Sequence, residues 1–358
     1  MQKLISIFVS GTAKQILPTQ FNPGVAIKLF EALSDLGFEI GGNPNSRYFI
    51  SINHNRKDYS RFIRSGGSAK NAILIRREPQ AVHPIQYRND IGSRYGLILS
   101  PGAISDIQKC NKLLRTPYII SSNPNSLSFS DQSISNLISS PGFSDLFKVN
   151  NWHERKYSLS LVASNKVSSS NQENYSLRRD LVWRYGDEIE VFGQLWDASV
   201  LSKIFHRIRV LVFSFRSGYI PCLKNVYGNM FRKYPRCQSV FEDKFTITRN
   251  SRFSLVIEND STCITEKLFD AFFSGSIPIY LGPELSQFGI PDELYLRIQD
   301  NFEFTLNEIK AMEDFEIQRR LTAISDFISS PNFYENWSDE KVFTSMAQKI
   351  NQYIAENR

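Results

Sequence analysis

The chain has 358 residues, of which 41% are hydrophobic and 22% charged, and a formal net charge of +6. This composition excludes disordered and collagen-like proteins, and the length allows two domains with well-filled cores. No segment is long and apolar enough to span a membrane, and residues 4–9 are too short for a signal peptide. We therefore expect a protein that works in a cytoplasm.

The chain lacks the spacing that marks disulfide frames and metal sites. No Cys-x-x-Cys pair, no histidine cluster and no Asp-x-Asp occurs. The isolated residues in question are Cys110, Cys222, Cys237, Cys263, His54, His83, His153 and His206. We expect free thiols, no zinc site and no carboxylate pair that holds Mg²⁺ or Mn²⁺.

The first part of the chain alternates apolar runs with helical patterns. Strands are predicted at 4–9, 48–52, 72–75 and 95–99, and helices at 25–36 and 59–63. This alternation predicts a mainly parallel sheet with helices on both faces. We assign residues 1–150 to an N-terminal Rossmann-like domain.

The second part repeats this alternation after a polar linker at 150–156. Strands are predicted at 157–163, 189–192, 253–257 and 277–281, with helices at 175–185, 304–320, 321–328 and 338–355. We assign residues 157–335 to a C-terminal Rossmann-like domain and 336–358 to a C-terminal helix. The overall prediction is an α/β fold of two Rossmann-like domains with a cleft between them.

The stretch 253–283 reads as strand, polar turn, helix and strand, and Glu258 and Asn259 follow its first strand. Ligands of open α/β sheets sit at the carboxyl ends of strands, and a helix N-terminus there suits an anion. Glu266 is a candidate acceptor for ribose hydroxyls, and Lys267 is a candidate partner of a diphosphate. The alternative is that both are ordinary surface charges in a first helical turn.

Glu78 stands between two arginines and a proline, in the sequence Arg76-Arg77-Glu78-Pro79. Pro79 restricts Glu78 to an extended conformation at the end of a predicted strand. A carboxylate held beside a bound hydroxyl can act as a general base. The alternative is a surface ion pair with Arg76 or Arg77.

A third candidate site follows the strand at 157–163. Ser164 and Asn165 begin its loop, and Arg178 and Arg179 lie on the next helix. A guanidinium can bind two phosphate oxygens at once, although arginines on helices are usually just solvated. Which of the two arginines would bind phosphate is left open.

The segment 198–241 contains eight Lys or Arg residues and no Asp or Glu. Three interpretations are open: packed helices with a solvated basic edge, contact with anionic lipid headgroups, or contact with nucleic acid. Basic residues near a membrane surface add roughly 1 kcal/mol each. The segment has no nucleic-acid-binding motif, so we expect no nucleic-acid partner.

The sequence FSLVIENDSTCITEKLFDAFFSGSIPIYLGP resembles the signature of the α-1,3/4-fucosyltransferase family, glycosyltransferase family ten. The matching positions are Glu258-Asn259, Thr265-Glu266-Lys267 and residues 277–282. Ser164-Asn165, Arg178 and the strand with Gly193 are similar to further family elements, as is Glu78 in the first domain. The resemblance is strong over residues 157–283. Two departures are Cys263, where the family usually has tyrosine, and a shorter loop between Asn259 and Glu266.

The resemblance implies a GT-B fold with two facing domains and an inverting reaction that needs no metal and no cofactor. The donor GDP-fucose would bind the C-terminal domain through Ser164, Asn165, Arg178, Asn259, Thr265, Glu266 and Lys267. The glycan acceptor would bind the N-terminal domain, where Glu78 would be the general base.

The absence of an N-terminal anchor indicates a bacterial type of enzyme, cytoplasmic or peripheral on the inner membrane. We expect an α-1,3-type linkage to GlcNAc or Glc, in surface polysaccharide or lipopolysaccharide synthesis. The alternatives are another nucleotide-sugar donor and a non-catalytic glycan-binding protein.

Overall fold

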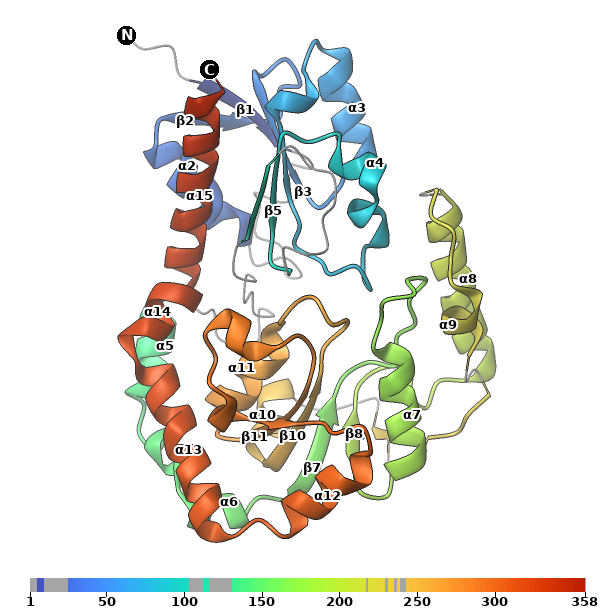
Figure 1. Cartoon of the computed structure of the whole chain (residues 1–358), viewed down its shortest axis with the longest axis vertical. Coiled ribbons are helices and arrows are strands. Elements are labelled where there is room, and N and C mark those ends of the chain that lie inside the picture. Colours follow the sequence, from blue (N-terminus) through green and yellow to red (C-terminus); the bar gives the residue numbers. More distant parts are fainter. Residues whose placement is uncertain are drawn as a thin grey trace. The chain divides into compact units, whose positions relative to one another are not determined.

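The computed structural model describes residues 5–9, 25–102, 112–115, 131–216, 218–228, 231–234, 237–238 and 243–357. Leu4, Cys110 and parts of the basic segment lie outside these ranges. The chain divides into two compact units: Met1–Ser135 with Pro331–Arg358, and Asn136–Ser330. Each unit contains its own six-stranded sheet (Figure 1).

The sheet of unit 1 is entirely parallel, in agreement with the alternation of strands and helices in the sequence. Its order is β2-β1-β3-β4-β5-β6. The strands are β1 (Ile5–Val9), β2 (Phe38–Gly41), β3 (Tyr48–Ile52), β4 (Ala72–Ile75), β5 (Leu97–Ser100) and β6 (Leu113–Arg115). β3 and β4 have the predicted bounds, whereas β2 and β6 were not predicted. β5 begins two residues later than predicted, and Tyr95, which precedes it, bonds His54 through its hydroxyl.

Helices cover the sheet of unit 1 on two sides. They are α2 (Val25–Asp35), α3 (Arg56–Arg64), α4 (Asn89–Gly92), α14 (Pro331–Trp337) and α15 (Asp339–Glu356), with 3-10 turns at Ala69–Asn71 and Pro84–Tyr87. α2 and α15 share one core with the sheet, to which α15 contributes Phe343, Met346 and Ile350. Helix α15 thus belongs to unit 1, whereas the sequence pattern predicts residues 336–358 as a separate C-terminal helix.

The sheet of unit 2 is also parallel, in the order β12-β11-β10-β7-β8-β9. The strands are β7 (Tyr157–Val162), β8 (Glu190–Phe192), β9 (Cys237–Gln238), β10 (Ser251–Ile257), β11 (Ile277–Leu281) and β12 (Leu296–Arg297). β10 pairs with β7 on one side and β11 on the other. The residues that follow these three strands therefore meet at one edge of the sheet.

The helices of unit 2 are α6 (Val149–His153), α7 (Tyr175–Tyr185), α8 (Val200–Arg216), α9 (Leu223–Tyr227), α10 (Lys244–Arg249), α11 (Glu266–Phe273), α12 (Phe302–Lys310) and α13 (Asp314–Ser329). Most of them lie around this sheet, whereas α8 and α9 lie farther out, beyond α7 (Figure 1). Short 3-10 turns lie at Ser144–Phe147, Leu285–Phe288 and Asp292–Leu294, and α5 (Asp131–Ile138) crosses the division between the units. None of the helices in the described residues is long and apolar enough to cross a membrane.

Two details of unit 2 differ from prediction. The expected linker at 150–156 overlaps helix α6, where Trp152 is buried and donates to the Arg252 carbonyl at 2.9 Å. The expected helix break at 320 and 321 is absent, and the break lies at 311–313 instead. α13 stays continuous because Ile317, Leu321 and Ile324 form one buried stripe at helical spacing.

Candidate functional site

Glu258 lies at the carboxyl end of β10 and is completely buried. Its Oε1 accepts a hydrogen bond from the Thr265 backbone N–H at 2.8 Å, and its Oε2 accepts from the Thr265 hydroxyl. Burial raises the pKa of Glu258, while Lys267 and Thr265 oppose the rise. Glu258 therefore holds the residue that begins α11 and fixes the position of that helix start.

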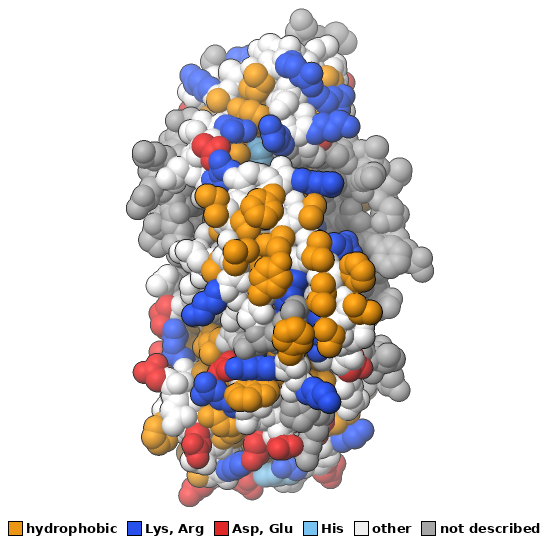
Figure 2. All heavy atoms as spheres, turned by 90° about the vertical axis from the view of Figure 1, so that its right-hand side faces the viewer, with side chains coloured by type: hydrophobic (Ala, Val, Ile, Leu, Met, Phe, Trp, Pro, Cys, Tyr) orange, Lys and Arg blue, Asp and Glu red, His pale blue; other side chains and the backbone are white. Residues whose placement is uncertain are grey.

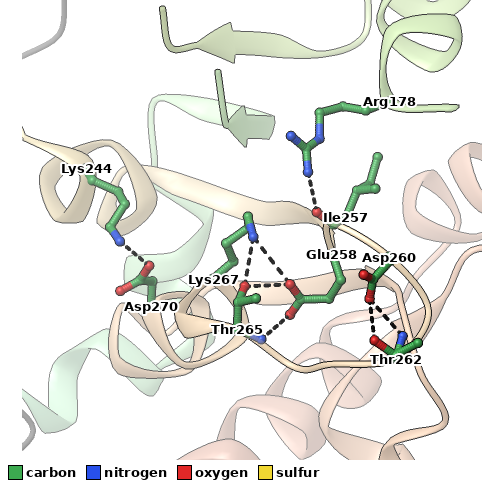
Figure 3. A network of polar contacts seen from close by, with 9 residues as sticks. All are labelled: Arg178, Lys244, Ile257, Glu258, Asp260, Thr262, Thr265, Lys267 and Asp270. Atoms are coloured by element: carbon green, nitrogen blue, oxygen red, sulfur yellow. Dashed lines mark hydrogen bonds and ion pairs between the residues drawn. The ribbon is translucent and has the colours of Figure 1, made fainter. Parts of the chain in front are cut away.

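Lys267 lies in the first turn of α11 and compensates this buried carboxylate (Figure 3). Its Nζ lies 3.3 Å from Glu258 Oε2 and donates to the Thr265 hydroxyl at 2.7 Å. An ammonium group has three N–H donors, and these contacts use two of them. These contacts hold the ammonium in place, and the side chain as a whole is 16% exposed.

Three further charged residues, Glu266, Lys244 and Asp270, lie near Lys267. Burial alone would raise the pKa of Glu266, but Lys267 and Lys244 together bring it below its ordinary value. Lys244 Nζ lies 2.6 Å from Asp270, whose pKa burial raises to about 6. Glu266 is therefore ionised at neutral pH and available as a hydrogen-bond acceptor at the helix start.

Arg178 and Arg179 are both buried but serve different contacts. Arg178 Nη2 donates to the Ile257 carbonyl at 2.7 Å, beside Glu258 (Figure 3). Its Nε has no hydrogen-bond partner within the described part of the chain. Arg179 instead donates to the Lys166 carbonyl at 2.6 Å and to the Ser176 hydroxyl at 2.8 Å. Arg178 therefore belongs to the β10 edge, whereas Arg179 holds the loop after β7.

Ser164 and Asn165 lie in that loop. It follows β7, the strand that pairs with β10 in the sheet. Asn165 N–H donates to the Gln194 carbonyl at 2.9 Å, and its side-chain amide donates to the Leu195 carbonyl at 3.3 Å. Gly193 has φ of 145°, and a Cβ there would lie 2.3 Å from the Ala163 carbonyl oxygen. The loop is thus fixed by its own contacts, and one of the two N–H donors of the Asn165 amide is already engaged.

Asn259 and Cys263 lie in the turn between β10 and α11. The Asn259 carbonyl accepts from Asn174 N–H at 2.9 Å, which joins the turn to the segment before α7. Cys263 is 1% exposed, and its Sγ lies 3.4 Å from the Thr262 hydroxyl. The position that departs from the family pattern therefore faces the interior.

Gly282, the last residue of the family-like pattern 277–282, is explained by packing. A Cβ at Gly282 would lie 2.3 Å from Tyr280 Oη and 2.8 Å from Glu258 Cγ. Tyr280 is fully buried, and its hydroxyl has no hydrogen-bond partner in the ranges that the structure describes. A glycine at 282 therefore leaves room for the side chains of Tyr280 and Glu258 at the carboxyl end of β10.

The candidate site in unit 1 lies at the carboxyl end of β4. Asn53 has a left-handed backbone with φ of 54°, and its side-chain oxygen accepts from the N–H groups of Arg77 and Glu78 at 2.9 and 3.1 Å. The Glu78 carbonyl accepts from Gln86 and from the Tyr87 hydroxyl. The half-buried Glu78 is therefore held through its backbone at the end of the strand.

His54 is a further candidate in unit 1 that sequence reasoning missed. It is 7% exposed, its Nδ1 lies 2.8 Å from the Tyr95 hydroxyl, and its Nε2 has no hydrogen-bond partner among the described residues. Burial, with Arg94 adding to it, lowers the pKa of His54 to about 4. The only sequence signal is its place two residues after β3, because ligand-binding residues of parallel sheets follow strands.

The low pKa of His54 predicts a pH effect on stability. Between pH 6.5 and 4 the unfolded chain binds a proton that the folded chain does not, so stability falls as the pH falls. We expect the wild type to lose about 2 kcal/mol more than the His54→Gln variant between pH 7 and 4.5. Urea unfolding at both pH values measures this difference. Equal losses in the two proteins would show that His54 does not have this low pKa.

Within the described residues, no three His, Cys, Asp or Glu side chains gather into a group able to hold a metal ion. No protein-family model matches the sequence, and no curated protein matches it either.

Solved structures, in contrast, resemble the whole chain. An α1,3-fucosyltransferase is similar with a TM-score of 0.50 and 16% identity, over 96% of this chain and 90% of that chain. A glycosyltransferase from Rickettsia africae is similar with a TM-score of 0.50 and 9% identity, over 99% of both chains. A protein from Anabaena in complex with UDP-glucose has a TM-score of 0.48 and 9% identity, over 94% and 82%. The predicted GT-B fold is confirmed by the two parallel sheets and the first two similarities.

Proposed function

We propose that this protein is an inverting glycosyltransferase that transfers fucose from GDP-fucose to a hydroxyl group of a glycan acceptor. The GT-B fold supports a transferase of nucleotide sugars, and the similar α1,3-fucosyltransferase structure agrees with fucose as the sugar. The family-like residues of the sequence supply the further support for this donor.

The observation that carries the proposal is the arrangement of cations at the β10 edge. Arg178 bonds the last carbonyl of β10, and Lys267 bonds the carboxylate that follows it. Both cations are thereby held in place before any ligand arrives, next to the N-terminal turn of α11. A diphosphate is the ligand chemistry that such fixed cations at a helix start favour.

In the proposed reaction, the acceptor oxygen attacks the anomeric carbon of fucose while the bond to the GDP oxygen breaks. Arg178 and Lys267 offset the charge that develops on the leaving diphosphate, without a metal ion. Glu78 takes the proton of the acceptor hydroxyl. Glu266 accepts from the ribose hydroxyls, and Ser164, Asn165, Asn259 and Thr265 shape the donor site through the loop positions described above.

The acceptor is proposed to be a GlcNAc- or Glc-containing glycan, fucosylated through an α-1,3-type linkage in bacterial surface polysaccharide or lipopolysaccharide synthesis. Incubation with GDP-fucose and an array of such acceptors, with the product linkage read by NMR, tests this part. A product with fucose on another sugar or position would replace this acceptor assignment.

A second candidate, transfer of a different nucleotide sugar, is favoured by Cys263. The family pattern has a tyrosine at this position, and a buried cysteine cannot stack on a nucleotide base as an exposed tyrosine would. This candidate keeps the cation arrangement and changes only the base or sugar that is selected.

We expect GDP-fucose to raise the melting temperature of the protein by about 5–10 °C at a concentration a hundred times its Kd. The reason is that a ligand of the folded state alone stabilises that state. Differential scanning fluorimetry with GDP-fucose, GDP-mannose, UDP-glucose and UDP-GlcNAc measures the effect. Stabilisation by a UDP-sugar alone would exclude the GDP-fucose assignment, and stabilisation by none would favour a non-catalytic glycan-binding protein.

A further inference from the structure

Helix α8 presents an apolar stripe to solvent. Leu201, Phe205, Ile208, Val212 and Phe215 are all exposed, and Phe205 and Phe215 are each 64% exposed. Their spacing of four, three, four and three residues places them on one side of the helix, within an arc of about 80°. A helix on the surface of a soluble domain normally turns such a stripe inward.

The opposite side of α8 carries polar residues and is the side that packs inward. Arg207 is 4% exposed and donates to the Val226 carbonyl at 2.6 Å and the Gly228 carbonyl at 3.2 Å. Ser214 is buried as well and bonds the Val210 carbonyl. On α8 the apolar residues therefore face solvent and the polar residues face inward, the reverse of a usual surface helix. These contacts of Arg207 hold α8 and α9 in that orientation.

The apolar surface continues beyond α8. Ile220 is 90% exposed and Phe231 is 74% exposed, and Leu223 and Tyr227 of α9 are exposed too. Eleven of the 18 large hydrophobic side chains that are exposed in the described ranges lie between residues 200 and 231. We call this surface, formed by α8, α9 and their neighbours, the apolar arm. Such a concentration on one surface marks an interaction site rather than scattered exposure.

The charge of the apolar arm has a single sign. Residues 198–241 contain eight Lys or Arg and no Asp or Glu. Arg209 and Arg216 are exposed beside the stripe on α8, and Lys224 is exposed on α9. Figure 2 shows the apolar side chains gathered on this face with Lys and Arg side chains at its border. An apolar face with a cationic edge is the chemistry of helices that lie in a membrane interface.

We propose that the apolar arm docks this protein on an anionic lipid bilayer, with the stripe of α8 inserted among the headgroups. A second copy of the chain fits less well, because a symmetric contact through this surface would bring the same cations together. A bilayer with anionic headgroups supplies both an apolar phase for the stripe and negative charge for its edge. This inference does not depend on the identity of the donor or the acceptor.

Flotation with vesicles tests the docking. We expect the purified protein to bind vesicles of phosphatidylcholine and phosphatidylglycerol and to bind pure phosphatidylcholine vesicles at least tenfold more weakly. Phe205→Ser with Phe215→Ser should weaken binding at least tenfold, because it removes two apolar anchors. Arg209→Gln with Arg216→Gln should weaken binding about 25-fold on anionic vesicles, and high salt should do the same.

Matched controls separate this effect from general changes. Phe304→Ser with Phe315→Ser removes two equally exposed phenylalanines elsewhere, and Lys57→Gln with Arg64→Gln removes two exposed cations of unit 1. Both controls should bind vesicles like the wild type, and all variants should keep their melting temperature and donor binding. Wild-type protein that ignores anionic vesicles, or Phe205 and Phe215 variants that still bind, would overturn the proposal. A dimer in sedimentation that these variants dissociate would identify a second copy as the occupant.

Discussion

Glu78→Gln is expected to lower the kcat of sugar transfer by roughly 10³-fold, in the range of a lost general base. Glutamine keeps the size of the side chain but cannot take the proton of the acceptor hydroxyl. The backbone of residue 78 is held by Asn53, Gln86 and Tyr87, so the substitution leaves the strand end intact. Steady-state kinetics with GDP-fucose and an accepted glycan measure the loss, and calorimetry should give an unchanged Kd for GDP-fucose.

Glu39→Gln, an exposed substitution on β2 of the same unit, is the matched control and should keep full activity. Full activity of Glu78→Gln would show that another group takes the proton. His54→Gln then becomes the decisive variant, because the neutral His54 Nε2 is buried at the end of the neighbouring strand β3. A loss in kcat for that variant alone would transfer the role of base to His54.

Arg178→Gln is expected to raise the Kd for GDP-fucose by about 100-fold, since it would remove a fixed charge from the proposed diphosphate site. Arg179→Gln should leave this Kd nearly unchanged and lower the melting temperature instead. The reason is that Arg179 bonds the Lys166 carbonyl and Ser176, and its loss leaves the loop after β7 without these donors. Calorimetric titration with GDP-fucose and thermal unfolding of both variants measure the two effects.

Two additional variants sharpen the comparison. Arg184→Gln changes an exposed arginine on the same helix and should affect neither the Kd nor the melting temperature. Arg178→Lys retains the charge but loses the planar fork, so an intermediate Kd would indicate that both charge and geometry contribute. If Arg179→Gln weakened GDP-fucose binding and Arg178→Gln did not, the assignment of the two arginines would be reversed.

Much of the fold could be predicted from short apolar runs. Residues 48–52, 72–75 and 253–257 are mostly apolar and alternate with helical patterns, which is why a mainly parallel sheet with helices on both faces was the expectation. The two-residue strands β9 and β12 carry too little pattern to be recognised. The sheet against which α15 packs could not be predicted. An amphipathic stripe indicates that one face of a helix is buried, but not which sheet buries it.

The residue types of the candidate site could be predicted from the sequence better than the contacts that these residues make. Glu258 and Lys267 stood out because they flank the end of a strand and the start of a helix. The separate roles of Arg178 and Arg179 depend on backbone carbonyls at residues 257 and 166, and no local pattern indicates such bonds. His54 was overlooked because its low pKa arises from burial and from Arg94, which are features of the folded structure.

The division of unit 1 into two segments sets an order for folding during synthesis. Unit 2 is one continuous segment and has all of its core residues once residue 330 has left the ribosome. Unit 1 lacks Phe343, Met346 and Ile350 of its core until α15 has been made. The usual sequence, in which the N-terminal domain folds first, is therefore reversed. The half of the molecule that carries Arg178 and Lys267 is expected to fold before the half that carries Glu78, so a nascent chain would acquire the proposed donor site first.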